Sequence, residues 1–170
     1  MPIESRNLVL AGFVGTGKST IGKKVAERLG LDFLDTDREV ERIAGRRIEE
    51  IIAASGESSF RSLEAHVCVR ASQRMDVVIA LGGGSLLDTK THETLAASGL
   101  IVCLTAPVDV ILQRIRAGKT RPLASDEVTI RKLFDERAEH YNELPYHIET
   151  SNKRIPQVTG EVATLWESQR

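Results

Sequence analysis

Cysteine is scarce in this sequence, and its few histidines do not cluster. Only 2 cysteines and 4 histidines occur in 170 residues, and the histidines never approach the spacing of a metal site. Cys68 and Cys103 lie far apart within apolar stretches, which argues against a disulfide framework. We therefore predict two reduced cysteines in the core of a fold that requires neither a disulfide nor a structural metal.

An excess of charge and a long apolar run are missing as well. The 23 basic and 24 acidic residues give a net charge of −1, so no broad basic surface for nucleic acid or an anionic membrane is expected. No stretch approaches the roughly 18 apolar residues of a membrane span, and the first apolar run is too short for a signal peptide. We expect a cytoplasmic protein of one domain, residues 1–170, in which any phosphate chemistry uses a local basic cluster.

Five short apolar segments alternate with longer stretches of helical periodicity. The segments span residues 7–13, 31–37, 76–84, 100–106 and 146–150. This alternation predicts a parallel sheet that is covered by helices. The third and fourth segments are apolar throughout, which is typical of strands buried on both faces, so we expect them to flank the first.

Apolar stripes at helical spacing follow several of these segments and should face the sheet. They comprise Ile21, Val25 and Leu29; Phe60, Leu63, Val67 and Ala71; and Val108, Ile111, Leu112 and Ile115. Gly118 can end the third of these helices, and Ser125 can cap the next. The charged loop between them, within residues 116–126, is a candidate lid.

The stretch "GFVGTGKST", residues 12–20, fits the phosphate-binding loop pattern in full. Its glycines let backbone N–H groups point at phosphate oxygens, and the following helix adds its positive amino-terminal end. Lys18 adds a full charge, and the Ser19 hydroxyl can ligate Mg²⁺ on a nucleotide polyphosphate. A glycine-rich turn that binds nothing is the alternative. We expect ATP contacts from Gly15, Thr16, Gly17, Lys18, Ser19 and Thr20.

Two carboxylates close the second strand, in "LDTD". If the strand stays extended to residue 37, Asp35 and Asp37 point to one side, where one could meet a metal and the other a hydroxyl. The alternative is that Asp37 is only the N-cap of the following helix.

Arginine occupies one position on an apolar helical stripe. The stripe comprises Ile130, Leu133, Phe134 and Tyr141, and its missing member at position 137 is Arg. Because an interior charge without a partner costs several kcal/mol, an anionic ligand is a fitting partner for Arg137.

A second arginine, Arg61, lies three residues before Glu64, the spacing at which a glutamate can brace a guanidinium along a helix. An ordinary surface ion pair is the alternative. Gly82, Gly83 and Gly84 follow a central strand, where ligands of open α/β sheets bind, so they suggest a close backbone approach. A flexible turn is the competing interpretation.

Together these motifs resemble the shikimate kinase family over nearly the whole chain. The resemblance rests on "GFVGTGKSTIGKKVAERLGLDFLDTDREVE", "GRRIEEIIAASGESSFRSLE", "LGGG", "RPLA" and "DERAEHY", which occur in the family's order. It implies an α/β fold like that of the nucleoside monophosphate kinases, with five parallel strands in the order 2-3-1-4-5. It also implies a substrate-binding region at about 36–64, a lid and a monomer.

The resemblance further implies transfer of the γ-phosphoryl group of ATP to the 3-hydroxyl of shikimate. Shikimate would be bound by Asp37, Arg61, Gly82, Gly83, Gly84 and Arg137, with both arginines on its carboxylate. Asp37 would accept from ring hydroxyls and assist proton removal. Mg²⁺ would be bound at Ser19 and Asp35, Arg121 would lie over the phosphates, and Arg114 and Arg154 would lie near the adenine.

Two departures from the family pattern affect these expectations. Glu139 and His140 stand where the family commonly has Pro-Leu, and Pro145 replaces an alanine. "RPLA" also replaces the commoner Arg-Pro-Leu-Leu. The alternatives are a related small-molecule kinase, such as a gluconate kinase, and a regulatory nucleotide-binding module without catalysis. The first typically lacks the triple glycine, and Lys18, Ser19, Asp35, Asp37 and Arg121 argue against the second.

Overall fold

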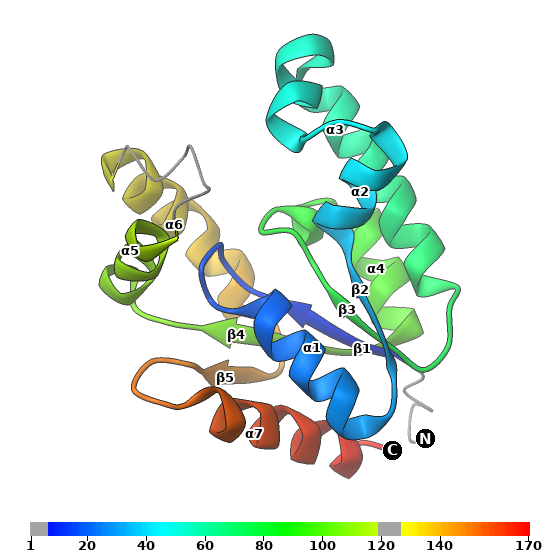
Figure 1. Ribbon diagram of the computed structural model, residues 1–170, viewed down its shortest axis with the longest axis vertical. Coiled ribbons are helices and arrows are strands. Elements are labelled where there is room, and N and C mark those ends of the chain that lie inside the picture. Colours follow the sequence, from blue (N-terminus) through cyan, green and yellow to red (C-terminus); the bar gives the residue numbers. More distant parts are fainter. Residues whose placement is uncertain (1–6, 119–126) are drawn as a thin grey trace.

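A five-stranded parallel sheet forms the centre of the molecule, as Figure 1 shows. This computed structural model describes residues 7–118 and 127–170. The strands are β1 (Asn7–Ala11), β2 (Asp32–Asp35), β3 (Val77–Ala80), β4 (Gly99–Thr105) and β5 (His147–Glu149). Their order is β2-β3-β1-β4-β5, and every neighbouring pair is parallel. The predicted topology is confirmed, including β3 and β4 on either side of β1.

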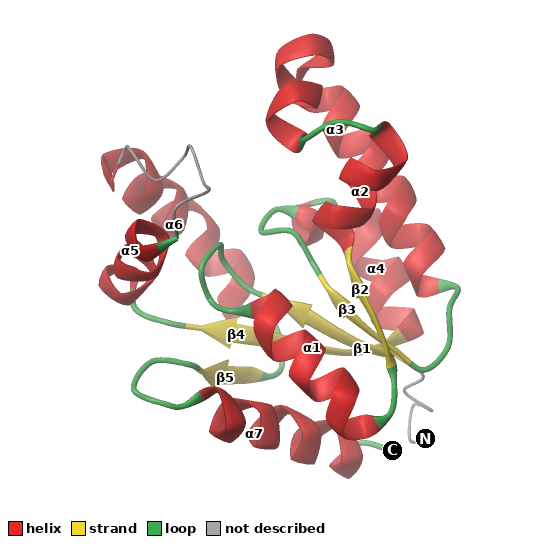
Figure 2. Cartoon of the chain, viewed as in Figure 1, coloured by secondary structure: helices red, strands yellow, loops and turns green. Residues whose placement is uncertain are grey.

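Helices cover both faces of the sheet (Figure 2). They are α1 (Lys18–Leu29), α2 (Thr36–Ala44), α3 (Ile48–Ser72), α4 (Thr89–Ser98), α5 (Val108–Ala117), α6 (Glu127–Asn142) and α7 (Ile155–Ser168), with a short 3₁₀ helix, η1 (Ser85–Leu87).

Side chains of β1 alternate between the two faces because successive residues of a strand point in opposite directions. Leu8 and Leu10 pack in one apolar cluster with residues of α1 and α7. Val9 and Ala11 belong to the cluster on the other face, which includes residues of α3, α4, α5 and α6. Each of the three predicted helical stripes contributes buried residues to these cores.

The α2–α3 corner projects beyond the sheet (Figure 1). It has an apolar cluster of its own, in which Val40 of α2 packs with Ile51, Phe60 and Val67 of α3. Gly56 has φ 85° and divides α3 into two helical parts. This corner carries Asp37 and Arg61 to the carboxyl ends of the strands.

The end of α5 lies where the sequence predicts it, at Gly118. The Gly118 N–H bonds to the carbonyl oxygens of Arg114 and Ile115, so the predicted end of α5 is confirmed. Ser125 and most of the predicted lid lie outside the described residues.

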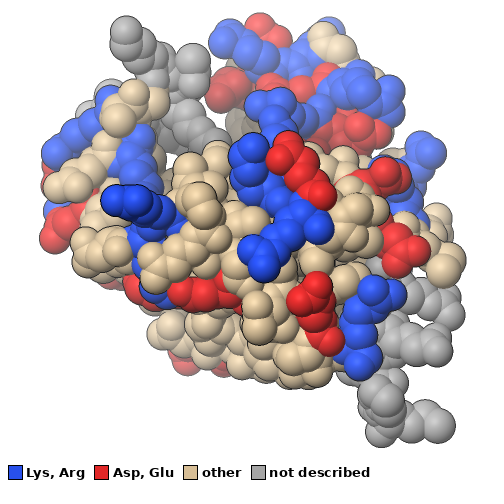
Figure 3. Space-filling model, turned by 60° about the horizontal axis from the view of Figure 1, so that its bottom comes forward, with Lys and Arg blue, Asp and Glu red and all other residues tan. Residues whose placement is uncertain are grey.

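Both cysteines are free and buried, as predicted. Burial raises the pKa of the Cys68 thiol to about 12 and that of Cys103 to about 11, which keeps both thiols protonated at neutral pH. Within the described part of the chain, no helix has the length and apolar character to cross a bilayer. Basic and acidic side chains are interspersed on the face in Figure 3.

Candidate active site

The loop between β1 and α1 has the backbone of a phosphate-binding loop. Gly12, Gly15 and Gly17 have φ values of 139°, 81° and 96°, which residues with a side chain rarely adopt. Gly17 is the N-cap residue of α1, so the loop leads directly into the N–H groups of the first helical turn. This is a cradle for an anion at the carboxyl end of β1.

Lys18 lies folded against this loop. Its Nζ donates to the carbonyl oxygens of Gly12 and Phe13, at 2.7 and 3.0 Å, and the side chain is buried. Thr16 is also buried and donates to Phe13 O at 2.8 Å, whereas Thr20 is exposed on α1. The predicted loop residues therefore share one site, with Thr20 at its outer edge.

The two carboxylates of "LDTD" do not follow the extended-strand prediction. β2 ends at Asp35, and Asp35 rather than Asp37 is the N-cap of α2, accepting from the N–H groups of Asp37 and Arg38. Asp37 lies in the first helical turn, where a helical turn replaces the period of two. Asp37 Oδ1 lies 2.6 Å from the position a Cβ on Gly82 would occupy. The two carboxylates thus face different neighbours.

Asp35 joins the second strand to the phosphate loop. The Ser19 hydroxyl donates to Asp35 Oδ2, while Oδ1 is used for the helix cap. A hydroxyl and a carboxylate in contact supply the oxygen ligands that Mg²⁺ prefers. No group of three or more His, Cys, Asp or Glu side chains suited to a metal occurs in the described ranges, so this pair is the candidate metal contact.

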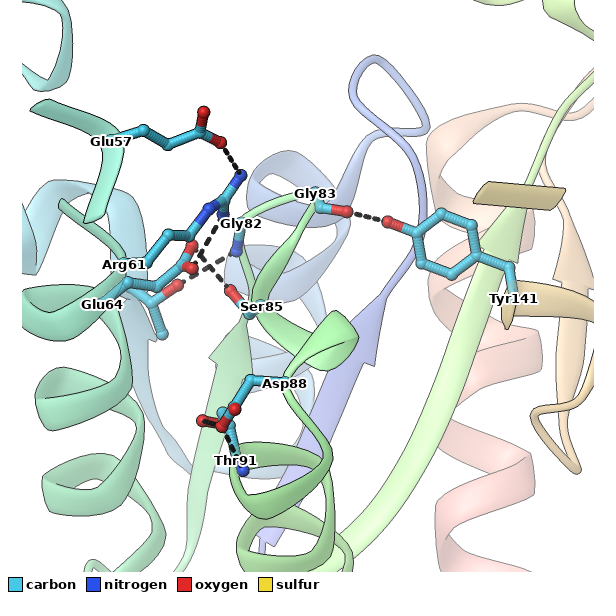
Figure 4. Close-up of polar contacts among 10 residues, drawn as sticks. Glu57, Arg61, Glu64, Gly82, Gly83, Ser85, Asp88, Thr91 and Tyr141 are labelled. Carbon is cyan, nitrogen blue, oxygen red and sulfur yellow. Dashed lines mark hydrogen bonds and ion pairs between the residues drawn. The ribbon is translucent and has the colours of Figure 1, made fainter. Parts of the chain in front are cut away.

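Arg61 and Glu64 form the predicted brace, but this is no ordinary surface ion pair. Arg61 Nη1 donates to Glu64 Oε1 at 2.9 Å, and the Glu64 side chain is only 5% exposed. Ser85 donates to the other oxygen of Glu64 at 3.0 Å (Figure 4). Burial opposes the charge on Arg61, but its bonds to Glu64 and the charge of Glu57 outweigh it, and the pKa of Arg61 is raised. Arg61 therefore remains a cation beside the glycine turn.

The triple glycine permits close approach, as predicted. A Cβ on Gly84 would lie 2.6 Å from Arg61 Nη1, and one on Gly82 would collide with Asp37. The Gly82 N–H donates to Thr36 Oγ1 at 3.1 Å, and the Gly83 carbonyl accepts from Tyr141. This turn is held by hydrogen bonds on both sides, which favours the close-approach interpretation over a flexible turn.

Arg137 completes this group from α6. Its Nη1 would lie 3.4 Å from a Cβ on Gly83, and its Nε is buried without a hydrogen-bond partner among the described residues. The apolar stripe around it is confirmed, since Ile130 and Tyr141 are buried and Leu133 and Phe134 pack against the core. No ion pair of Arg137 is seen within residues 7–118 and 127–170, so the described part of the chain supplies no anionic partner for it.

Arg114 lies beside the phosphate loop. Its Nη1 donates to Gly15 O at 3.2 Å and to Thr150 Oγ1 at 2.9 Å, and Nη2 donates to Thr150 O at 3.2 Å. Arg154 is exposed at the N-cap position of α7. Arg121 lies outside the described residues, so its position relative to the phosphate loop stays a prediction.

Three polar residues of the site were missed by the sequence patterns. Thr36, Ser85 and Tyr141 hold the glycine turn or its glutamate. Thr36 stands between two predicted site residues, which was a usable signal. Tyr141 was assigned to the apolar stripe, and nothing in helical spacing reveals that its hydroxyl reaches another element.

Comparison with known proteins agrees with this arrangement of loop, carboxylates, arginines and glycine turn. A family model described as shikimate kinase matches residues 14–166. The chain belongs to the shikimate kinase family. A shikimate kinase from Caldanaerobacter subterraneus is 43% identical over 160 residues, which are 92% of this chain and 94% of that protein.

Solved structures extend the comparison from sequence to fold. Shikimate kinase from Acinetobacter baumannii, in complex with shikimate, is 35% identical with a TM-score of 0.90, covering 99% of this chain and 96% of that one. A gluconokinase from Sinorhizobium meliloti has a TM-score of 0.63 at 18% identity, covering 96% of this chain and 95% of that one. The gluconokinase shares the fold alone.

The departure from the shikimate kinase pattern at residues 139 and 140 lies within a continuous helix. α6 runs through both positions to Asn142. The His140 ring stacks edge-on against His92 of α4, with centroids 5.9 Å apart. This member of the family therefore joins α6 to α4 through a histidine pair.

Proposed function

We propose that this shikimate kinase transfers the γ-phosphoryl group of ATP to the 3-hydroxyl of shikimate, giving shikimate 3-phosphate and ADP. One observation carries the proposal. Arg61 and Arg137 lie against the same glycine turn, and the buried Arg137 Nε has no partner among the described residues. Two guanidinium groups on one turn suit a small planar carboxylate, and that turn lies at the same edge of the sheet as the phosphate loop.

On the nucleotide side, residues 12–20 bind the phosphates of ATP. The N–H groups of the loop and the first turn of α1 face the phosphate oxygens, and Lys18 exchanges carbonyl contacts for phosphate contacts. Ser19 and Asp35 would hold Mg²⁺, which would supply charge neutralisation at the phosphates. Arg114 of α5 and Arg154 at the start of α7 border the nucleotide, and Arg121 covers the phosphates.

On the acceptor side, Arg61 and Arg137 bind the carboxylate of shikimate. Gly82, Gly83 and Gly84 allow the ring to approach the backbone, and Asp37 accepts from ring hydroxyls beside Gly82. Asp37 also assists removal of the proton from the attacking hydroxyl. Catalysis then comes mostly from positioning the hydroxyl in line with the γ-phosphorus and from neutralising charge.

The proposal treats residues 1–170 as one kinase domain. Residues 36–64 form its substrate-binding region, and residues 116–126 form its lid. We infer that the protein acts as a monomer, as the resemblance to the family implies.

An ADP-release assay with three acceptor conditions tests the function. We expect MgATP-dependent ADP release with shikimate and only background release with gluconate or without an acceptor. Product analysis should find the phosphate on the 3-hydroxyl. Equal turnover with gluconate would refute the assignment, and ADP release that ignores the acceptor would indicate a simple ATPase.

A further inference from the structure

The glycine turn is held by a hydroxyl from α6 that the proposed reaction does not use. Tyr141 lies one helical turn after Arg137, and its O–H donates to the carbonyl oxygen of Gly83. Figure 4 shows Tyr141 reaching the turn from the side opposite to Arg61. The α6 helix is therefore bonded to Gly83, while α3 is bonded to Ser85, directly after the three glycines.

The Tyr141 hydroxyl donates to the Gly83 carbonyl and also lies in hydrogen-bond contact with the Arg137 side chain. Burial raises its pKa to about 12, while the nearby Arg137 charge opposes that change, so the phenol stays neutral at working pH. A buried phenol needs a hydrogen-bond partner, and the Gly83 carbonyl is the partner that the structure provides.

The backbone of Tyr141 is itself attached to the sheet. His147 Nε2, on β5, lies 2.8 Å from the Tyr141 carbonyl oxygen, which can only accept. The Leu144 N–H bonds to the same carbonyl at 3.1 Å. Tyr141 therefore connects the glycine turn, through its hydroxyl, to β5, through its carbonyl.

We propose that Tyr141 is a positioning residue for the acceptor pocket, which fixes the Gly83 peptide at the distance from Arg137 that the acceptor requires. The proposal rests on the proposed function for the identity of the acceptor, shikimate. Tyr141 touches no reacting atom in it. Its effect should therefore appear in acceptor affinity and leave the nucleotide side unchanged.

Tyr141→Phe removes this O–H and keeps the ring in the core. We expect the KM for shikimate to rise about 3- to 10-fold, which is the loss of one hydrogen bond. Both kcat and the KM for ATP should stay within about twofold. Tyr146→Phe is the matched control, because its hydroxyl bonds to Gln169 at 3.0 Å on the exposed side of α7. It should change none of these values.

Amide hydrogen exchange of the protein without ligands gives a readout that does not depend on the substrate. Residues 81–88 should exchange about 3- to 10-fold faster in Tyr141→Phe than in the wild type or Tyr146→Phe. Unchanged exchange there, or an unchanged KM for shikimate, would overturn the proposal.

A joint rise of both KM values on a protein that melts earlier would also overturn it, because that result is expected of a purely structural tyrosine. A wild-type enzyme that ignores shikimate would refute the proposed function instead. The exchange data would then decide the role of Tyr141 at the glycine turn by themselves.

Discussion

The two halves of the site are built in opposite ways. The nucleotide side is one continuous stretch, residues 12–20, whose shape comes from glycine backbone and from Lys18 and Thr16 bonded to loop carbonyls. The acceptor side combines Asp37 of α2, Arg61 of α3, the glycine turn after β3 and Arg137 of α6. The second half has no continuous stretch of its own and depends on side-chain bonds between distant segments, whereas such bonds only add Asp35 and Arg114 to the phosphate loop.

This difference predicts which substitutions impair each half of the site. Loss of function on the nucleotide side should come from residues that contact ATP themselves. On the acceptor side, the binding groups are held by hydrogen bonds from residues that do not contact shikimate in the proposal. These are Thr36, Glu64, Ser85 and Tyr141. Changes at these buried residues should impair binding of shikimate without touching it.

The largest expected effect is that of Lys18→Met on the nucleotide side. The substitution keeps the length of the side chain but removes the charge used on phosphate, so kcat should fall about 10²- to 10³-fold. The fold should stay intact, which circular dichroism can check, although the bonds from Lys18 to the carbonyls of Gly12 and Phe13 are lost. Full activity in this variant would mean that the loop does not bind the transferring phosphate.

A second, smaller effect is expected when the buried partner of Arg61 is changed. Glu64→Gln removes the buried charge that holds Arg61, so the KM for shikimate should rise about 10- to 30-fold and the protein should lose about 1–3 kcal/mol of stability. The KM for ATP should stay constant in the same assay.

Glu57→Gln is the matched control, since Glu57 contacts the same arginine at 3.5 Å but is 70% exposed. An exposed pair contributes only about 0–1 kcal/mol, so this variant should remain near wild type. Equal effects of the two substitutions would show that burial of the Arg61 contact is irrelevant.

The smallest effect is expected at the border of the nucleotide side. Arg114→Ala removes the bonds to Gly15 and Thr150, so the KM for ATP should rise about 3- to 10-fold with the KM for shikimate unchanged. Arg74→Ala is the control, because Arg74 pairs with Asp32 at the opposite end of the sheet. If steady-state kinetics of Arg114→Ala instead show a changed KM for shikimate, the nucleotide and acceptor sides are not independent.

The same contrast explains what the sequence could predict. The five strands and the phosphate loop depend on apolar runs and glycine spacing, which are local, so their order and position were predicted. Arg137 was also found, because helical periodicity alone marks a charge on a buried stripe. The assumption that β2 continues to residue 37 was wrong, because Asp35 caps α2 and Asp37 lies in its first turn.

The bonds that fix the glycine turn could not be predicted from local patterns. Thr36 and Gly82 are 46 residues apart, and Tyr141 and Gly83 are 58 residues apart. Such contacts arise only when the sheet brings β2, β3 and α6 together. Glu64 was expected as a brace for Arg61, but its burial and its bond to Ser85 come from the same packing.

Arg137→Ala is the variant that tests whether Arg137 is held for the carboxylate of shikimate. The measurements are separate titrations with shikimate and MgADP, and thermal melts of the protein without ligands. If Arg137 is held for the carboxylate of shikimate, affinity for shikimate should fall by about 2–5 kcal/mol, roughly 30- to 5,000-fold, with MgADP affinity unchanged. The melting temperature should stay the same or rise, because the buried Nε has no hydrogen-bond partner within the described residues. Loss of both affinities on a protein that melts earlier would contradict the account.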